Sequence, residues 1–295
     1  MTTCELPDFE IEFTLPTCVE EMKQEEYLDF IRILAASGKE GWDEDHLCLE
    51  LLYLLSPISK GANRLSLESA IALKQMADEL RALFITTTVK GKSYRVPRLE
   101  TAKAVVTEFM HDGVRYFGPQ DALRTSNFSE FITSFYAFKD YVDTQDEVHL
   151  LKLSAILYRP GSEDLFKEFG DARKPFNKAH VASRMENFKS LPPEYVKATK
   201  YFYSGFQQFL QDQKVRIGGS DISMQHLFHG KKKSNQAGQP DQGWIDVLFH
   251  LAESSVFGNV KETEEQSMWT VFSRLYQLHR EAKEQERRNK KNSIK

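Results

Sequence analysis

Cysteine is scarce in this chain of 295 residues. The three cysteines, Cys4, Cys18 and Cys48, are odd in number and have no metal-like spacing to one another or to a pair of histidines. Such a pattern indicates neither a disulfide framework nor a zinc site. A reducing compartment fits this cysteine usage best.

Long hydrophobic runs are also missing. No stretch offers the roughly 20 consecutive apolar residues that a membrane-spanning helix needs. The first residues, MTTCELPDFEIEF, lack a basic segment followed by an apolar one, which is the pattern of a secretory signal. The sequence therefore predicts a soluble, cytoplasmic protein.

The sequence motifs of common catalytic sites are absent as well. We find no GxxxxGK[ST], GxSxG or HExxH pattern. RIGGSD at 216–221 lacks the strand and helix that flank a phosphate-binding loop, so it predicts a turn. His226 and His229 have a spacing seen in metal sites, but no cysteine or acidic pair accompanies them, which favours polar surface. We expect no enzyme, no cofactor and no bound metal.

Charge of neither sign dominates the whole chain, but its distribution is uneven. There are 39 basic and 43 acidic residues, whereas the last sixteen, REAKEQERRNKKNSIK, hold seven Lys or Arg and only three Glu. A basic tail on an acidic body could reach nucleic acid or an anionic protein surface. The alternative is a solvated helix end, where cations suit the helix dipole.

Apolar and aromatic residues are plentiful and recur mostly with helical spacing. The chain is 41% hydrophobic and 12% aromatic, which suffices for one large core or two moderate ones. We predict a mainly α fold, a multi-helix bundle with a small β-sheet or hairpin near the N-terminal region. Strands are expected at 9–13 and, as a hairpin, within 84–97; the two could pair in one sheet. A helix from Ser66 to Phe84 is expected to turn these residues inward: Leu67, Ala70, Ile71, Leu73, Ala77, Leu80 and Phe84.

Capping signals locate the central helices. Asn127 with Glu130, and Thr144 with Glu147, have N-cap spacing and predict an antiparallel helical hairpin. A further helix is expected near 178–190, and Pro192-Pro193 opens a long one through Gln213. We divide the chain into a helical region with a small sheet (1–98), a central helical domain (99–230), a polar linker (231–243) and a helical pair with a basic tail (244–295).

The segment Tyr158-Arg159-Pro160 ends an apolar helix with an aromatic ring and a cation. Pro160 stops the helix and biases Arg159 away from helical backbone angles. The Tyr158 hydroxyl or the Arg159 guanidinium can then cap helix-end carbonyls, with Asp171 as an ion partner for Arg159. We predict a structural corner rather than a catalytic site.

The closing helices carry two apolar stripes. Two short helices after a linker cannot bury both stripes against each other, so they must dock on the body or on a partner. If a partner binds there, the residues expected to contact it are Trp244, Leu248, Trp269, Phe272 and Tyr276.

Four segments together resemble phage and prophage tail-region proteins of Bacteroidota, which are similar in plan to tail assembly chaperones: LPTCVEEMKQEEYLDFIRIL, LLKLSAILYRPG, ARKPFN and GWIDVLFHLAE. The resemblance implies a non-enzymatic role in phage tail assembly, as a chaperone or adaptor in the host cytoplasm. It also implies a protein partner, such as the tape measure protein. Two alternatives stay open: a structural virion component (baseplate or connector), or a nucleic-acid-associated protein that uses the basic tail.

Overall fold

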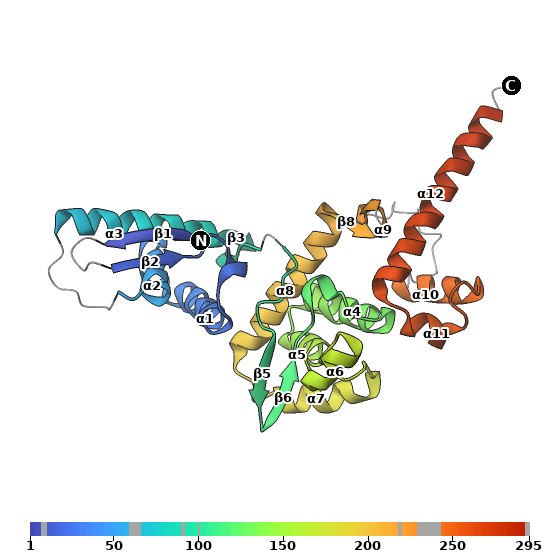
Figure 1. The fold of residues 1–295 in the computed structure, drawn as a ribbon, viewed down its shortest axis with the longest axis horizontal. Coiled ribbons are helices and arrows are strands. Elements are labelled where there is room, and N and C mark those ends of the chain that lie inside the picture. Colours follow the sequence, from blue (N-terminus) through green and yellow to red (C-terminus); the bar gives the residue numbers. More distant parts are fainter. Residues whose placement is uncertain are drawn as a thin grey trace. The chain divides into compact units, whose positions relative to one another are not determined.

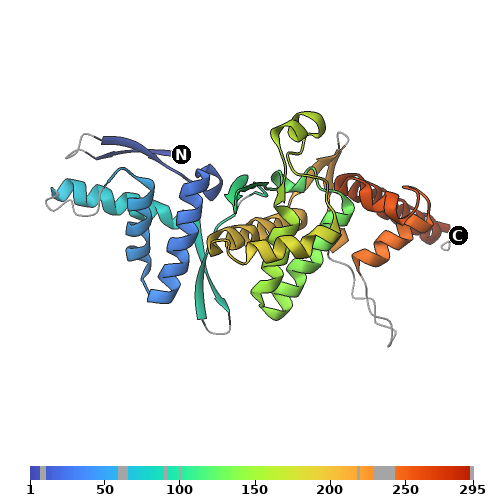
Figure 2. The same ribbon diagram turned by 90° about the horizontal axis from the view of Figure 1, so that it is seen from below.

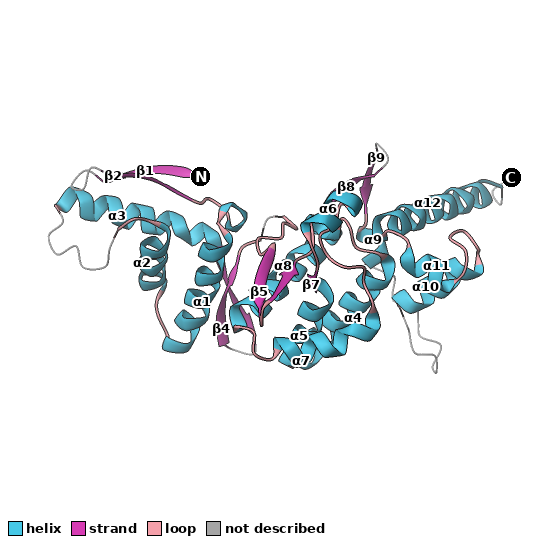
Figure 3. Cartoon of the chain, turned by 60° about the horizontal axis from the view of Figure 1, so that its bottom comes forward, coloured by secondary structure: helices cyan, strands magenta, loops and turns pink. Residues whose placement is uncertain are grey.

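The computed structural model describes residues 1–6, 11–58, 66–89, 92–99, 101–217, 220–228 and 243–292. The chain forms two compact units: unit 1 is Met1–Thr107 with Ser190–Gly205, and unit 2 is Glu108–Lys189 with Phe206–Lys295. The described part is mainly helical, with several small antiparallel sheets, one of them near the N-terminus (Figures 1 and 3). The predicted fold class is confirmed.

Two separate hairpins supply the strands of unit 1. Strand β1 (Thr2–Leu6) pairs antiparallel with β2 (Ile11–Leu15), and β3 (Phe84–Val89) pairs with β4 (Lys92–Pro97). The hairpin at 84–97 is thereby confirmed. The predicted pairing of this hairpin with the first strand is wrong, because the extended N-terminal residues provide that strand's partner instead.

Three helices form the body of unit 1: α1 (Gln24–Glu40), α2 (Glu44–Leu55) and α3 (Leu67–Glu79). Neighbouring helices pack on each other, and α3 lies along β1 (Figures 1 and 2). Asp43 and Ser66 cap the starts of α2 and α3 by accepting backbone N–H bonds. The predicted inward face of α3 is partly wrong, because Leu67, Ala70 and Ile71 are exposed, and Phe84 begins β3 instead of ending the helix. The buried face is narrower: Ser69, Leu73, Met76 and Ala77, continued by Leu80.

Unit 2 is built on a helical hairpin. Helix α4 (Phe128–Thr144) packs on α5 (Glu147–Leu157), which also contacts α7 (Val181–Phe188), as Figure 1 shows. A three-stranded antiparallel sheet, β5 (Glu108–His111), β6 (Val114–Phe117) and β7 (Arg159–Pro160), follows the order β5–β6–β7. The remaining elements before the last helices are α6 (Glu163–Phe169), α8 (Pro193–Asp212, which contributes to both units), β8 (Lys214–Ile217), β9 (Ser220–Ser223) and α9 (Gln225–Phe228).

The predicted final helical pair is three helices, α10 (Trp244–Glu253), α11 (Val260–Glu265) and α12 (Met268–Asn292). The chain leaves the helical conformation at Gln266–Ser267 because its backbone pairs there with the start of α4. Phe128 N–H donates to Gln266 O (2.8 Å) and Met268 N–H donates to Ser126 O (3.1 Å). We call these paired backbones the α4–α12 seam.

The predicted linker 231–243 lies outside the described residues except for Gly243. The predicted first boundary, at 98/99, falls near the end of the first segment of unit 1 at Thr107, while residues 190–205 return to that unit. Within the described ranges, no helix combines the length and apolar character that crossing a bilayer requires.

Candidate interaction surface

The C-terminus of α5 ends inside the protein, where its last carbonyl groups cannot reach water. Three different arginines supply the missing donors. Arg184 Nε donates to Ala155 O (2.7 Å), Arg159 Nη1 donates to Ile156 O (3.1 Å) and Arg173 Nη1 donates to Leu157 O (3.0 Å). Each helix leaves its last carbonyls without intrahelical partners, so these arginines cap the end of α5 one carbonyl at a time.

Two carboxylates balance this group of cations. Glu130 Oε1 lies 2.8 Å from Nη1 of both Arg159 and Arg173. Asp171 takes the other edge of Arg173, accepting from Nε (3.0 Å) and Nη2 (2.8 Å), and Thr125 also donates to it (2.7 Å). The side chains of Glu130, Arg159 and Arg173 are 1%, 4% and 0% exposed. With Arg184, these residues form what we call the buried ion cluster.

The charges of the cluster nearly cancel. Three guanidinium groups face two carboxylates, and the C-terminus of α5 adds a partial charge of roughly −0.5. Burial lowers the pKa of Arg159, although Glu130 opposes this, and burial lowers the pKa of Arg184 to about 10. Burial also opposes the ionisation of Asp171, but its bonds from Arg173 hold its pKa below the ordinary value. Arg184 and Asp171 are therefore charged near neutral pH, as is Arg173, whose pKa the two carboxylates raise against the effect of burial.

The Tyr158–Pro160 corner is part of this arrangement. Tyr158 is buried, and its ring centroid lies 5.2 Å from that of Phe109. Pro160 and Arg159 form β7, which pairs with β6, and Arg159 Nε donates to Lys174 O (2.8 Å). The expected ion pair of Arg159 with Asp171 is replaced by one with Glu130, because Arg173 occupies the Asp171 carboxylate.

We predict that Arg159→Ala lowers the free energy of unfolding by about 1–3 kcal/mol, because it removes the donors of the buried Ile156 carbonyl and the partly buried Lys174 carbonyl. Chemical denaturation followed by circular dichroism measures this loss. An unchanged unfolding midpoint together with lost partner binding would instead make the corner a recognition site.

The buried ion cluster also fixes the base of α6. Ser162 N–H donates to Ala172 O and Lys174 N–H donates to Pro160 O, both at 2.9 Å. A Cβ on Gly161 would lie 1.7 Å from Ala172 O, so only glycine allows this approach of the two chains. The segment that carries α6 is therefore a compact loop whose two ends are joined by backbone hydrogen bonds.

Helix α6 itself is uncovered. None of its seven residues is buried, and Phe166 and Phe169 are 54% and 67% exposed. Ser162 caps its start, and Gly170, with φ of 71°, ends it. Two large apolar side chains are therefore held at the surface by a rigid base.

Three of the five predicted partner-binding residues lie in the interior of unit 2. Trp244, Leu248 and Phe272 are buried. The Trp244 ring meets the Phe131 ring edge-on at 4.9 Å and the Phe272 ring at 5.5 Å. The backbone N–H of Trp244 donates to the Tyr136 hydroxyl (3.1 Å). The α10 stripe thus docks on α4 within the chain, which takes these three side chains off the surface.

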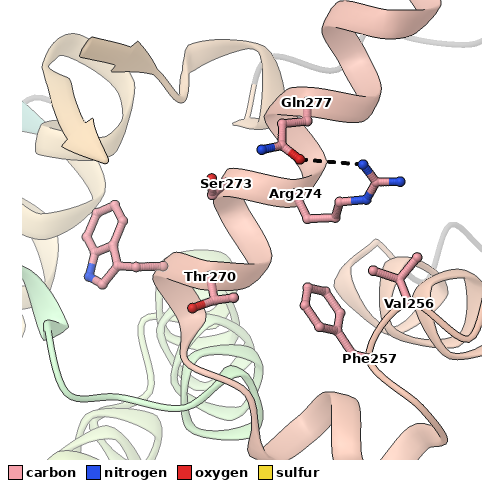
Figure 4. Close-up of a pocket in the computed structure, with 7 residues that line it drawn as sticks. Val256, Phe257, Thr270, Ser273, Arg274 and Gln277 are labelled. Carbon is pink, nitrogen blue, oxygen red and sulfur yellow. Dashed lines mark hydrogen bonds between the residues drawn. The ribbon is translucent and has the colours of Figure 1, made fainter. Parts of the chain in front are cut away.

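The other two predicted residues, Trp269 and Tyr276, are half-buried. Trp269 lines an open groove of about 370 Å³ between α12 and the turn after α10. Figure 4 shows Arg274 of α12 extending toward Val256 and Phe257 of that turn. We call this the α12 groove; its lining is Val256, Phe257, Trp269, Thr270, Ser273, Arg274 and Gln277.

One cation in the α12 groove is only partly satisfied. Arg274 Nη1 approaches Gln277 Oε1 (3.4 Å) and Glu281 Oε1 (3.7 Å). Its buried Nε has no hydrogen-bond partner among the described residues. The Arg274 side chain as a whole is 29% exposed. The groove therefore offers apolar walls and a guanidinium group to which a ligand carboxylate or carbonyl could bind.

Comparison with protein-family models, curated proteins and solved structures found no match for this chain. The described residues contain no group of three or more His, Cys, Asp or Glu that could hold a metal ion. Of the two histidines with metal-like spacing, His226 and His229, the second lies outside the described ranges.

Several residues of these surfaces were not singled out from the sequence, or were given another role. The N-cap spacing pairs Glu130 with Asn127, and the Glu130 N–H does bond to the Asn127 side chain, but the Glu130 carboxylate pairs with Arg159 and Arg173. The signal that could have revealed this is its isolation, because it is the one charged residue among the first eleven of α4. Phe166 and Phe169 gave a weaker signal, two aromatic residues inside the polar segment EDLFKEF.

Proposed function

We propose that this protein is a non-enzymatic chaperone or adaptor of phage tail assembly that acts in the host cytoplasm. It binds a helical segment of a tail protein, such as the tape measure protein, in the α12 groove. The observation that carries the binding role is this groove, an open surface with apolar walls on α12, the last helix of unit 2. The sequence resemblance to phage tail-region proteins supports the choice of partner.

The groove suits a helix better than a small polar ligand. An amphipathic helix binds by laying apolar side chains into such a depression. Val256 is 44% exposed, so these side chains could pack against it. Arg274 at the same place favours a segment that has a carboxylate next to its apolar anchor.

We predict that Trp269→Ala weakens binding of the tail segment about tenfold or more, as expected for an aromatic anchor of a small interface. Isothermal titration calorimetry of the full chain with peptides from the tape measure sequence gives the affinity. Raising the salt concentration should change it little. Val256→Asp provides a second test at the opposite wall.

Trp42→Ala is the matched control. Trp42 is also half-buried, but it stacks on His46 in unit 1, so its loss should leave binding unchanged. Equal binding by wild type, Trp269→Ala and Val256→Asp would rule out the groove as the binding site.

The exposed end of α12 supports one second candidate. Residues 280–291 are all exposed and carry the cations of the basic tail. A nucleic-acid-associated protein would bind through Arg287, Arg288, Lys290 and Lys291, with an affinity that falls steeply as salt is raised. Binding that is abolished by moderate salt and kept in Trp269→Ala would favour this role.

A further inference from the structure

Helix α6 is a second surface without a partner in the chain. Phe166 and Phe169 lie three residues apart, so they project from the same side of the helix. Buried aromatic side chains each remove about 150–250 Å² from water. The pair, which we call the α6 knob, therefore exposes apolar area that a binding surface could cover.

The knob is already held in one position. Its base is closed by the backbone bonds at Ser162 and Lys174, by a bond from Gln120 to Gly170 O, and by the buried ion cluster beneath. Binding a rigid element costs less conformational entropy than binding a mobile one. Exposing two phenylalanines to water is energetically unfavourable. We therefore interpret the knob as a preorganised binding surface.

The charges around the knob are mainly negative. Helix α6 contains Glu163, Asp164 and Glu168 but only one cation, Lys167. Lys167 lies 3.4 Å from Asp164 and Arg115 lies 3.1 Å from Glu163, whereas Glu168 forms no ion pair with the part of the chain that the structure describes. A complementary surface would be an apolar depression with a cation beside it.

The α12 groove has these properties. Val256, Phe257 and Trp269 supply apolar walls, and Arg274 supplies the cation. Its volume of about 370 Å³ lies within the roughly 300–1,000 Å³ of typical ligand pockets. In its own chain the knob does not fill the groove, because both phenylalanines are exposed and neither lines it.

We propose that the α6 knob of one copy binds the α12 groove of a second copy of this chain. The contact is heterologous, so each pair of copies keeps one free knob and one free groove, and association can continue. This inference rests on the groove of the proposed function and adds its regulation, because self-association and the tail segment compete for the same surface.

Sedimentation velocity of the full chain tests this over roughly 1–100 µM, the range suited to a small interface. The mean sedimentation coefficient of wild type should rise with concentration. Phe166→Ser/Phe169→Ser and, separately, Val256→Asp should each remove the rise. The matched control is Leu67→Ser/Ile71→Ser, two exposed apolar residues of α3, which should leave it intact.

Mixing the two defective proteins gives the decisive measurement. The Phe166→Ser/Phe169→Ser protein keeps its groove and the Val256→Asp protein keeps its knob, so an equimolar mixture should form a dimer that grows no further. Circular dichroism checks that both variants fold, and Arg274→Glu replaces Val256→Asp if the latter does not. The proposal is overturned by a wild type that stays monomeric, by variants that still associate, or by a mixture without dimers.

The test of self-association can fail or succeed independently of the test of tail-segment binding. A monomeric wild type that still binds the tail segment through Trp269 would refute self-association alone. Self-association that depends on the knob and groove, without binding of any tail segment, would refute the tail-binding role alone. If both hold, adding the tail segment should return the sedimentation coefficient to that of the monomer.

Discussion

Replacing Glu130 by Ala is expected to lower the free energy of unfolding by about 3–5 kcal/mol, the cost of breaking a buried ion pair from one side. Its carboxylate is the counter-charge shared by Arg159 and Arg173, and it is 1% exposed. Without it, the three guanidinium groups of the cluster stay buried with only the Asp171 carboxylate to balance them. Urea unfolding followed by circular dichroism measures the effect on unit 2.

The companion variants separate charge from packing. Glu130→Gln keeps the shape and should cost nearly as much, since the lost charge is the cause. Arg159→Ala should cost less, because it leaves Arg173 and Arg184 against Glu130 and Asp171. Lys139→Ala breaks an exposed pair with Asp143 on the same helix and should leave the midpoint unchanged. A Glu130→Ala midpoint equal to that of Lys139→Ala would refute the account.

Replacing Trp244 by Ala is expected to lower the free energy of unfolding by about 3–5 kcal/mol, as for other buried aromatic residues. Trp244 contacts the rings of Phe131 and Phe272 and is the first residue of α10. Its loss opens a cavity between α4 and the closing helices. Thermal unfolding by calorimetry should show a lower transition temperature.

Trp269→Ala gives the contrast, because Trp269 is half-buried and lines the groove rather than filling the core. It should lower the transition temperature much less than Trp244→Ala while weakening partner binding more. If Trp269→Ala lowered the transition temperature more than Trp244→Ala and weakened partner binding less, Trp269 would be the core residue and Trp244 the binding residue.

Much of the fold follows from local sequence signals. The Asn127 side chain accepts from Glu130 N–H (2.8 Å), so the predicted cap of α4 is confirmed. The cap of α5 is Asp146 rather than Thr144, because α4 continues to Thr144, whose hydroxyl bonds to Asp140 O. The spacing of apolar residues predicts most of the helices but misplaces some of their ends. The end of a helix depends on which backbone carbonyls and hydrogen-bond donors are available nearby.

The surfaces could be predicted only in part. Helical spacing grouped Trp269 and Phe272, but it could not show that Phe272 turns to the core while Trp269 lines a groove. That difference depends on the α4–α12 seam, which joins segments far apart in the sequence. The buried ion cluster is likewise invisible to local rules, because its charged side chains come from α4, from β7, from the segment after α6, and from α7.

The α4–α12 seam also sets an order in biosynthesis. The Tyr136 hydroxyl bonds to Trp244, which lies 108 residues further along the chain. The seam at Phe128 can form only after Gln266 and Met268 have been synthesised. Chains emerge from the ribosome at about 5–20 residues per second, so the apolar side of α4 is complete several seconds before its cover exists. A ribosome that stops before α10 holds a nascent chain in which Phe128 and Phe131 are uncovered, a substrate for the folding and degradation machinery of the cell.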